Sequence, residues 1–259
     1  MPYIFALSAT NVRQLMTTIV CTYLSRQEQL NKTLISLLQY PPDGFILIIV
    51  DDGSPEDIVL PELPYQVDII KLKDKTWHNT CVPFNIGLKK ALSYNPEIVI
   101  IQNAECLHSG DILSEAAKVK GDNYLSFACY SLAKGETPAV EKQNKAASFN
   151  DESSWYNHSV YRPFGFHFCC AITADNLRKL NGFDERLADG VAYEDNMFLH
   201  QIHNLGLRID FIDDPMVYHQ WHDRSYEITE ELIKRNYTVF VELQKGSEYR
   251  AKHIITPDL

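Results

Sequence analysis

The sequence predicts an α/β fold with a mostly parallel central sheet flanked by helices. Runs of apolar, β-branched residues alternate with segments of helical periodicity, which is the pattern of successive β-α-β units. Residues 45–50 show the strand type best, because an unbroken apolar run is typical of a strand covered on both faces. The chain of 259 residues is long enough for one large domain or two small ones.

The expected strands are short apolar stretches bounded by turn residues. Residues 45–50, for example, lie between Gly44 and the turn Asp-Asp-Gly-Ser. We expect Pro215 to interrupt the chain after the last strand, because proline cannot donate a ladder hydrogen bond. The strands expected in chain order are residues 18–22, 45–50, 67–72, 98–101, 124–132, 166–172 and 207–212.

The expected helices carry apolar residues that recur every three or four positions. In the first of them, Leu30 and Leu34 share one face. Pro83 suits the first turn of the second helix, and Gly206 suits the end of the fifth. The helices expected in chain order are residues 27–38, 83–94, 110–120, 175–180, 194–205 and 228–243.

No long linker divides the chain, so we expect residues 17–225 to form one domain and residues 226–259 to extend it with a helix. Residues 1–16 are poorly patterned, and no role is predicted for them. Residues 134–158 are polar and without periodicity, which predicts a long loop between the two halves of the chain.

Charge and composition exclude several classes of protein. The net charge of −10 argues against a nucleic-acid partner, which needs clustered Lys and Arg. The same charge repels an anionic ligand, so a diphosphate would need a metal ion or local amides to hold it. The apolar runs are too short to span a bilayer, and the N-terminus lacks the features of a signal peptide. The six Cys residues have no CxxC spacing, so we expect a cytoplasmic protein with reduced, buried thiols.

Acidic and amide side chains follow two of the expected strands. Asp51 and Asp52 stand at the carboxyl end of residues 45–50, the edge where open α/β sheets bind ligands. A turn that uses Asp and Gly for local hydrogen bonds also explains them. Asn103 and Glu105 alternate along extended chain, so they can point at one object, and oxygen ligands suit Mg²⁺ or Mn²⁺. Taken alone, a solvated strand end is the simpler explanation of that pair.

Two further groups come from the second half of the chain. Glu194 and Asp195 begin a helix, where the helix dipole favours carboxylates for purely structural reasons. A rigid helix start is equally what a general base requires. His219 and His222 lie far in sequence from any Cys, so a zinc site is not indicated, and each alone is typical of an ordinary structural histidine.

Taken in order, these motifs resemble the inverting family-2 glycosyltransferases of the GT-A fold. The resemblance covers roughly residues 17–225, and the second half is most similar to the galactosyltransferase-type branch. The matching stretches are Thr-Tyr-Leu-Ser-Arg at 22–26, Val-Asp-Asp-Gly-Ser at 50–54, Asn-Ile-Gly at 85–87, Asn-Ala-Glu at 103–105, Gly-Phe-Asp-Glu at 182–185, Glu-Asp-Asn at 194–196 and Tyr-His-Gln at 218–220.

The resemblance implies a role for each matching residue. Asp195 would be the catalytic base and Glu194 a contact to the acceptor. Glu105 and His219 would hold Mn²⁺ or Mg²⁺, although the family carries Asp-x-Asp where this chain has Asn103 and Glu105. The donor, expected to be a UDP-linked sugar, would contact Thr22, Tyr23, Arg26, Asp51, Asp52, Asn85 and Asn103.

The acceptor, a glycan or another hydroxyl compound, is expected near the 134–158 loop. Trp155 and Tyr156 lie near the end of that loop, and aromatic rings of this kind stack on sugar faces. The alternative is that both rings simply anchor the loop to the core.

Two other functions remain open from the sequence alone. A sugar nucleotidyltransferase uses a similar sheet, but it normally has a Gly-rich basic loop after the first strand, whereas residues 22–26 contain no Gly. A non-catalytic nucleotide-sugar-binding protein is favoured by the Asn at position 103. It is disfavoured by the intact pair of Glu194 and Asp195.

Overall fold

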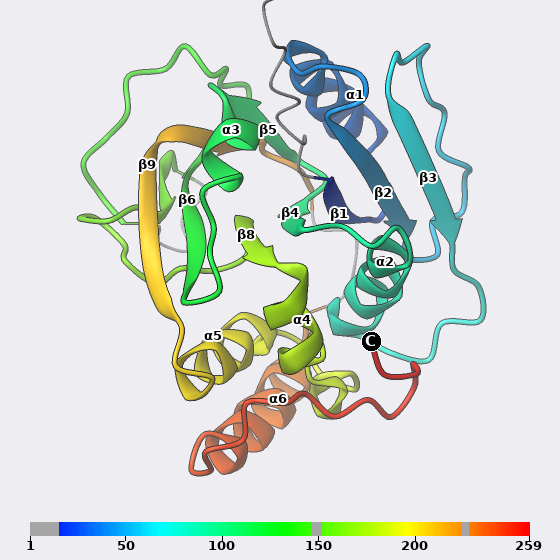
Figure 1. Ribbon diagram of the computed structural model, residues 1–259, viewed down its shortest axis with the longest axis vertical. Helices are drawn as coiled ribbons and strands as arrows, with labels where there is room; N and C mark the ends of the chain where they lie inside the picture. The colour runs from blue at the N-terminus through cyan, green and yellow to red at the C-terminus, as the bar shows by residue number, and fades with distance from the viewer. Residues whose placement is uncertain (1–15, 147–151, 224–227) are drawn as a thin grey trace, which may run out of the picture.

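The computed structural model describes residues 16–146, 152–223 and 228–259. Figure 1 shows these residues as a twisted sheet with helices packed around it, so the predicted α/β class is confirmed. Residues 1–15, the middle of the 134–158 loop and the predicted domain boundary at 225 lie outside the described residues.

The elements agree with most of the predicted ranges. The strands are β1 (Thr17–Tyr23), β2 (Phe45–Asp51), β3 (Gln66–Lys71), β4 (Ile98–Asn103), β5 (Cys106–Ser109), β6 (Asn123–Ser131), β7 (Ser154–Asn157), β8 (Cys169–Thr173) and β9 (Arg208–His219). The helices are α1 (Gln27–Ser36), α2 (Cys81–Ser93), α3 (Ile112–Ala116), α4 (Ala174–Leu180), α5 (Glu194–Asn204) and α6 (Glu230–Leu243), with short 3₁₀ turns η1 (Leu37–Gln39) and η2 (Glu185–Leu187).

The strands pair in the order β3-β2-β1-β4-β8-β6-β9-β5, and β7 adds to β6. The first four run parallel, as predicted. Beyond β4 the sheet is mixed, because β8 is antiparallel to both β4 and β6, and β5 is antiparallel to β9. The predicted sheet is therefore parallel in the first half of the chain, whereas the second half is mixed, with β6 and β9 parallel and the other pairings antiparallel.

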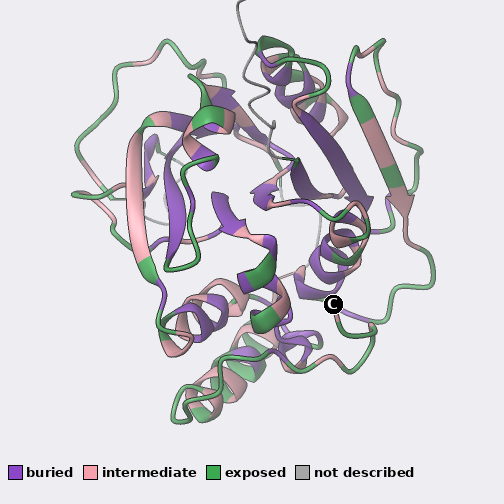
Figure 2. Cartoon of the chain, viewed as in Figure 1, coloured by how far each residue is buried: buried purple, intermediate pink, exposed green. Residues whose placement is uncertain are grey.

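Both faces of the central strands are buried, which Figure 2 shows as continuous purple along β2. Alternate residues of β1 and β2 enter two apolar clusters, one packed with α1 and α3 and the other with α2, α4 and α5. Helix α2 lies very close to the sheet at Gly87, where a Cβ would come within 2.6 Å of Val20 and 2.8 Å of Val50. Glycine is therefore required at this contact.

The structure corrects several element boundaries. Strand β9 runs through Pro215 to His219, whereas the predicted strand covers residues 207–212 with a break at Pro215 after it. The pairing of β6 with β9 shifts register between Phe127 and Cys129, and proline is tolerated at such a bulge because a ladder hydrogen bond is already lost there. The helix predicted for residues 110–120 is only α3, and the strand predicted from residue 166 begins at Cys169.

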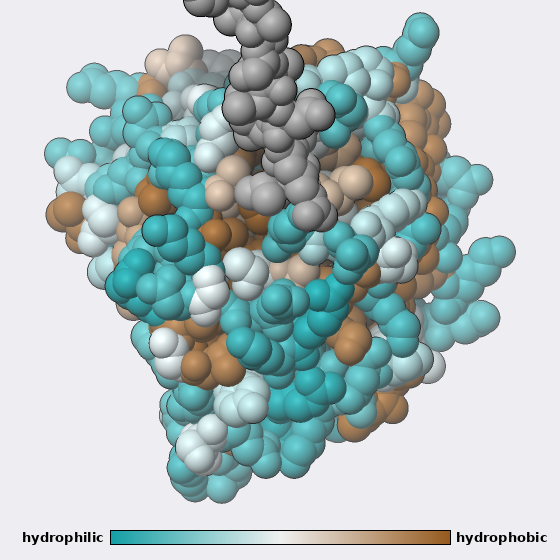
Figure 3. Space-filling view, viewed as in Figure 1, coloured by the Kyte–Doolittle hydropathy of each residue, from teal (hydrophilic) through white to brown (hydrophobic). Residues whose placement is uncertain are grey.

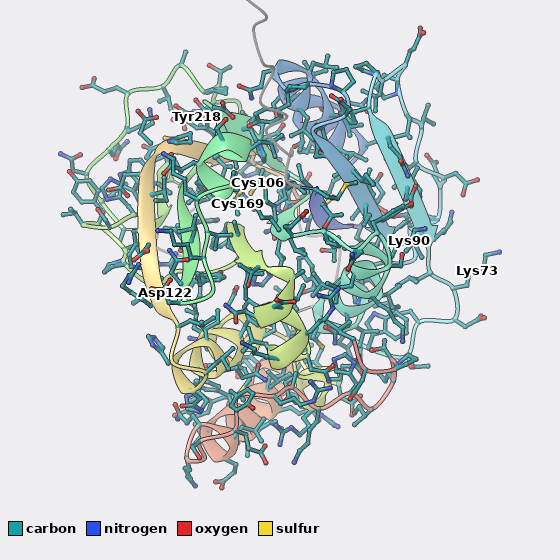
Figure 4. All side chains as sticks on the ribbon, in the orientation of Figure 1. Lys73, Lys90, Cys106, Asp122, Cys169 and Tyr218 are labelled. Atoms are coloured by element: carbon teal, nitrogen blue, oxygen red, sulfur yellow. The ribbon has the colours of Figure 1, made fainter. Side chains whose placement is uncertain are left out.

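The surface and the cysteines agree with the composition. The face drawn in Figure 3 is largely hydrophilic, with its apolar residues scattered. All six cysteines are free and buried, and Figure 4 labels Cys106 and Cys169 in the interior, whereas Lys73 extends outward. Among the described helices, none has the length and apolar character that crossing a bilayer requires.

Candidate active site

A cavity of about 270 Å³ opens at the edge of the sheet where β1 and β4 end. The end of β9 and the start of α5 complete its wall, so both halves of the chain contribute to it. The residues that line it are Thr22, Arg26, Thr80, Phe84, Asn103, Glu105, Tyr156, His167, Phe168, Glu194, Asp195, His219, His222 and Ile228.

Glu105, His219 and His222 form a cluster of possible metal ligands in this wall. Oε1 of Glu105 lies 3.2 Å from Nε2 of His219 and 3.4 Å from Nε2 of His222. The backbone sets this spacing, because Cys106 pairs with His219 in the β5–β9 ladder. The N–H of Gln220 then donates to the carbonyl of Glu105 at 3.1 Å. Strand pairing therefore brings Glu105 and His219 together, and His222 follows three residues after the end of β9.

The electrostatics of the cluster suit a cation. Burial opposes the charge of Glu105, but hydrogen bonds from both imidazoles and the charge of Arg26 hold its pKa well below the ordinary value. Burial lowers the pKa of His219, and neutral imidazole is the form that binds metals. Oε2 of Glu105 is buried and has no hydrogen-bond partner among the described residues. A carboxylate oxygen is therefore left for a metal ion.

Arg26 supplies a positive charge beside these ligands. Its Nη1 lies 2.8 Å from Oε1 of Glu105, and the residue immediately precedes α1. A guanidinium at a helix start is well placed to bind phosphate oxygens, because the backbone N–H groups there also point at an anion.

The second functional group of the cavity is the pair of carboxylates that begins α5. Oδ1 of Asp195 forms an ion pair with Nδ1 of His167 and lies 3.4 Å from the backbone nitrogen of the same residue, which donates to it. The imidazole of His167 is buried between Phe84 and Phe183, with ring centroids 4.8 Å apart in both contacts. Asp195 keeps about a quarter of its side-chain surface exposed, 26%, so the cavity can reach it.

The two carboxylates differ electrostatically. Burial alone would lower the pKa of His167, but the charges of Asp195 and Glu194 outweigh burial and the net shift is upward. Burial, followed by the charge of Asp195, raises the pKa of Glu194, whose Oε2 accepts a hydrogen bond of 2.8 Å from Asn79. Asp195 thus pairs with an imidazole whose pKa is raised, whereas the raised pKa of Glu194 favours its neutral form. Of the two carboxylates, Asp195 is the one with an imidazole partner, and it is better suited to act as the base.

Most of the residues selected from the sequence meet in this cavity. Those that line it are Thr22, Arg26, Asn103, Glu105, Tyr156, Glu194, Asp195 and His219. Asp51 and Asp52 lie at the same sheet edge but outside the lining. Oδ1 of Asp51 accepts the N–H of Ser54 at 2.8 Å, so it closes the turn. Asp52 is held by Lys75 and, at 2.8 Å, by the indole N–H of Trp77.

Three of the selected residues lie elsewhere. Tyr23 is packed in the core with 4% of its surface exposed. Asn85 is fully buried; its amide donates to the carbonyl of Phe183 at 2.8 Å and accepts the N–H of Phe183 at 2.8 Å. Trp155 is buried in a small cluster with Tyr130 and Tyr218, so its ring is covered. Asn85 and Trp155 are therefore buried outside the cavity, and of the two predicted acceptor aromatics only Tyr156 lines it.

Two histidines of the site were not selected from the sequence. His222 matches no motif of the family, and the absence of a nearby Cys speaks against zinc for both His219 and His222. The feature of the sequence that could have indicated His222 is its spacing of three residues from His219 at a strand end. His167 lies in the stretch that precedes β8 and carries no motif of its own. Only the packing of that stretch against the start of α5 brings it to Asp195.

Comparison with known proteins gives one family and a set of similar folds. The sequence model described as Glycosyl transferase family 2 matches residues 17–181. Comparison with curated protein sequences gave no match. Among solved structures, TarS of S. aureus in complex with UDP-GlcNAc is 17% identical with a TM-score of 0.61, over 88% of this chain and 66% of that one.

Two further structures share the fold. GalNAc-T7 with UDP, GalNAc and Mn²⁺ is 14% identical with a TM-score of 0.65, over 88% of this chain and 48% of that one. The mannosyltransferase PcManGT from Pyrobaculum calidifontis, in complex with GDP-Man and Mn²⁺, is 16% identical with a TM-score of 0.53, over 83% of this chain and 59% of that one. The chain thus spans less than two thirds of the length of each of these proteins.

Proposed function

The chain belongs to glycosyl transferase family 2, and from this premise we propose that it transfers a sugar from a nucleotide-diphosphate sugar to an acceptor hydroxyl with inversion at the anomeric carbon. The observation that carries this proposal is that a His-paired carboxylate, Asp195, and a carboxylate–imidazole cluster face one cavity. Such a cavity offers a base for the acceptor and a cation site for the leaving diphosphate.

The ligand cluster fits a divalent cation, and its chemistry favours Mn²⁺ over Mg²⁺. Glu105 would supply an oxygen, and His219 and His222 would supply nitrogens. Mg²⁺ is bound mainly through oxygen, whereas imidazole is a common ligand of transition metals. A bound ion would neutralise the diphosphate and so stabilise it as a leaving group. The similar folds of GalNAc-T7 and PcManGT, both solved with Mn²⁺, support this choice.

Charge and the position of the sheet edge support a donor site in this cavity. Arg26 and Asn103 would contact the diphosphate oxygens, and Thr22 lies beside them in the lining. Asp52, which directly follows β2, would meet the base or ribose, as the resemblance implies. A UDP-linked donor is favoured, because TarS and GalNAc-T7 were solved with UDP or a UDP-sugar.

The transfer step uses Asp195 as the general base. The acceptor hydroxyl oxygen bonds to the anomeric carbon while the bond from that carbon to the diphosphate breaks, and the hydroxyl proton passes to Asp195. Attack from the side opposite the leaving group inverts the anomeric configuration. Glu194 and Tyr156, which line the same cavity, would contact the acceptor.

The first prediction tests this assignment with Asp195→Asn. The variant should release nucleoside diphosphate about 10²–10⁴-fold more slowly, because the general base is lost, while donor binding stays close to normal. Turnover is measured with a panel of nucleotide-sugars that includes UDP-GlcNAc and GDP-Man, and donor binding is measured as a rise in melting temperature.

Asp189→Asn serves as the matched control, because Asp189 is a half-exposed carboxylate outside the cavity. The product of the wild-type reaction is examined by NMR for its anomeric configuration. Normal turnover in Asp195→Asn would remove Asp195 as the base, and a product with retained configuration would contradict inversion.

A further inference from the structure

A second cavity, of about 460 Å³, lies between α1, β5 and the loop that follows β6. It shares no lining residue with the first cavity. The two are linked through the short segment after β9, since Gln220 and Trp221 line the second cavity while His219 and His222 line the first. Its volume falls in the usual range for small-molecule sites, about 300–1,000 Å³.

The cavity has an aromatic and an aliphatic surface. The indole of Trp221 is half-buried, and the ammonium of Lys134 lies 4.3 Å from the centre of its ring. Leu107 of β5 and Leu132 contribute aliphatic surface. Lys134 is exposed on a long flexible side chain, so it can move aside and leave the ring face to a ligand.

One buried polar atom in the wall lacks a partner. Gln220 is 5% exposed, and its Nε2 donates to the carbonyls of Gln29 and Glu105, both at 3.0 Å, and to Oγ1 of Thr33 at 3.2 Å. The two carbonyls can only accept, so they fix which end of the amide is nitrogen. The remaining atom, Oε1, has no hydrogen-bond partner among the described residues. An unpaired buried carbonyl is costly, so a ligand that displaces its surroundings, reaches it and donates a hydrogen bond would be stabilised here.

The rim restricts the ligand further. Glu28 and Glu136 bring carboxylates to the lining, and Lys32 and Lys134 bring an equal number of ammonium groups, so the lining carries no net charge and suits a neutral ligand. Lys32 and Lys134 are donors only, so the ligand must also accept hydrogen bonds. A hydroxyl group both donates and accepts hydrogen bonds, and the ring of Trp221 can pack against an apolar face of the ligand. A pyranose combines hydroxyl groups at its edge with such a face.

We propose that this second cavity binds a neutral saccharide, as a remote unit of the acceptor glycan. That the saccharide belongs to the acceptor rests on the proposed function, whereas saccharide binding itself does not depend on catalysis. Gln220 and Trp221 lie in the chain between His219 and His222, which line the first cavity. A saccharide bound in the second cavity would therefore be held beside the first. Contacts remote from the reacting centre commonly supply affinity of this kind.

The test measures binding of lactose, cellobiose, maltose and chitobiose by saturation-transfer NMR, without nucleotide-sugar. Two variants attack the cavity from different sides. Trp221→Ala removes the ring, and Thr137→Trp fills the space from the loop. In each, the affinity for the best of these disaccharides should fall about tenfold or more, the effect expected for one lost stacking contact.

Tyr249→Ala is the matched control, because Tyr249 is an aromatic residue, 42% exposed, that lines neither cavity. Binding of Mn²⁺ is titrated in every variant to show that the ligand cluster is intact. The proposal is overturned if no disaccharide binds the wild type, if Thr137→Trp retains full affinity, or if Tyr249→Ala loses as much as Trp221→Ala.

The same titration in Asp195→Asn separates this proposal from the proposed function. If that variant keeps full turnover, the assignment of the base fails, whereas disaccharide binding still reports on the second cavity. If turnover is lost in Asp195→Asn and disaccharides do not bind the wild type, the proposed function stands and the saccharide site is wrong.

Discussion

At the scale of single residues, the contact between His167 and Asp195 determines how the proposed base is oriented. A carboxylate at a helix start can rotate about its side-chain bonds. Here the imidazole and the backbone N–H of His167 both meet Oδ1 of Asp195, which fixes that oxygen. Phe84 and Phe183 in turn hold the imidazole in place. The proton of an acceptor hydroxyl would therefore pass to the other oxygen, Oδ2.

This contact predicts a pH dependence for His167→Asn. Because the folded-state pKa of His167 is raised, the folded protein binds the imidazole proton more tightly than the unfolded chain does. The resulting stability is fully present below the ordinary histidine pKa of about 6.5 and is lost as the pH rises through the raised value. The melting temperature of the variant should lie about 3–6 °C below wild type at pH 6, and the gap should narrow towards alkaline pH.

Melting curves of both proteins between pH 6 and pH 9 check this prediction. His203→Asn is the control, because His203 is exposed and remote from Asp195, and it should show no such trend. A gap of constant size across the range would mean that the imidazole contributes packing alone.

A second prediction at this scale concerns His222. The distances from Oε1 of Glu105 to Nε2 of His222 and to Nε2 of His219 differ by only 0.2 Å. The variants His222→Ala and His219→Ala should therefore weaken Mn²⁺ binding to a similar extent. We expect each to cost at least about 10–100-fold in affinity, the range found even for residues that only support metal ligands. Isothermal titration with Mn²⁺ measures it, and His203→Ala should bind as wild type. Wild-type affinity in His222→Ala would exclude it as a ligand.

At the scale of elements, α6 holds the segment that leads into α5. Nδ2 of Asn236 donates to the carbonyls of Leu187 at 3.0 Å and Ala192 at 2.8 Å, and Asn236 is the one fully buried residue of α6. The segment passes so close that a Cβ on Gly190 would lie 2.3 Å from the amide oxygen of Asn236. The position of Asp195 thus depends on a helix that contributes no described residue to the cavity.

We therefore predict that Asn236→Leu impairs both stability and turnover. The substitution removes one hydrogen bond from each of two carbonyls, which keep only the longer bonds from Gly190 at 3.4 Å and Asn79 at 3.2 Å. The free energy of unfolding should therefore fall by about 1–3 kcal/mol. The rate constant kcat should fall more than KM rises, because the base is displaced while the donor site is not. Urea unfolding and steady-state kinetics measure both, with Lys234→Ala on the exposed face of α6 as the control. Unchanged kcat in folded Asn236→Leu would show that α6 does not position Asp195.

The same scale shows what the sequence can predict. Apolar periodicity, with Pro and Gly as boundaries, located α1, α2, α5 and the buried strands within a few residues, because these signals act within one element. The four-residue strands β5 and β7 are too short to show a pattern. The predicted break at Pro215 is wrong because β9 accommodates the proline at a bulge in its pairing with β6. That bulge involves residues distant in sequence, so the local pattern does not reveal it.

At the scale of the whole molecule, the site joins the two halves of the chain. The family model ends at residue 181, so Arg26, Glu105 and His167 lie within it, whereas Asp195, His219 and His222 lie beyond. Strand β9 lies between β6 and β5, and this order is what places His219 beside Glu105. Strand order is a long-range property, so the sequence predicted the motif residues at the sheet edge but neither the antiparallel pairings beyond β4 nor the third ligand.

The C-terminal segment packs back onto the first half of the molecule, and in Figure 1 it ends beside α2. The N–H of Ala251 donates to the carbonyl of Leu180 at 2.7 Å. Oε2 of Glu185 accepts the N–H groups of three consecutive residues at 2.8, 2.7 and 3.0 Å, those of Ile254, Ile255 and Thr256. Glu185 also accepts a hydrogen bond of 3.0 Å from Asn85, which lies in α2.

Deletion of residues 247–259 should accordingly destabilise the entire domain instead of detaching a separate unit. The buried carboxylate of Glu185 would lose these three N–H donors and keep the hydrogen bond from Asn85, and a buried charge that loses most of its donors is strongly destabilising. We expect the melting temperature to fall by about 5–10 °C and the transition to remain single. A chain that begins at Met16 is the matched truncation, since the sequence predicts no role for residues 1–15, and it should melt as wild type. If the C-terminal deletion melts as wild type and keeps its turnover, residues 247–259 are an appendage, and the predicted extension of the domain ends with α6.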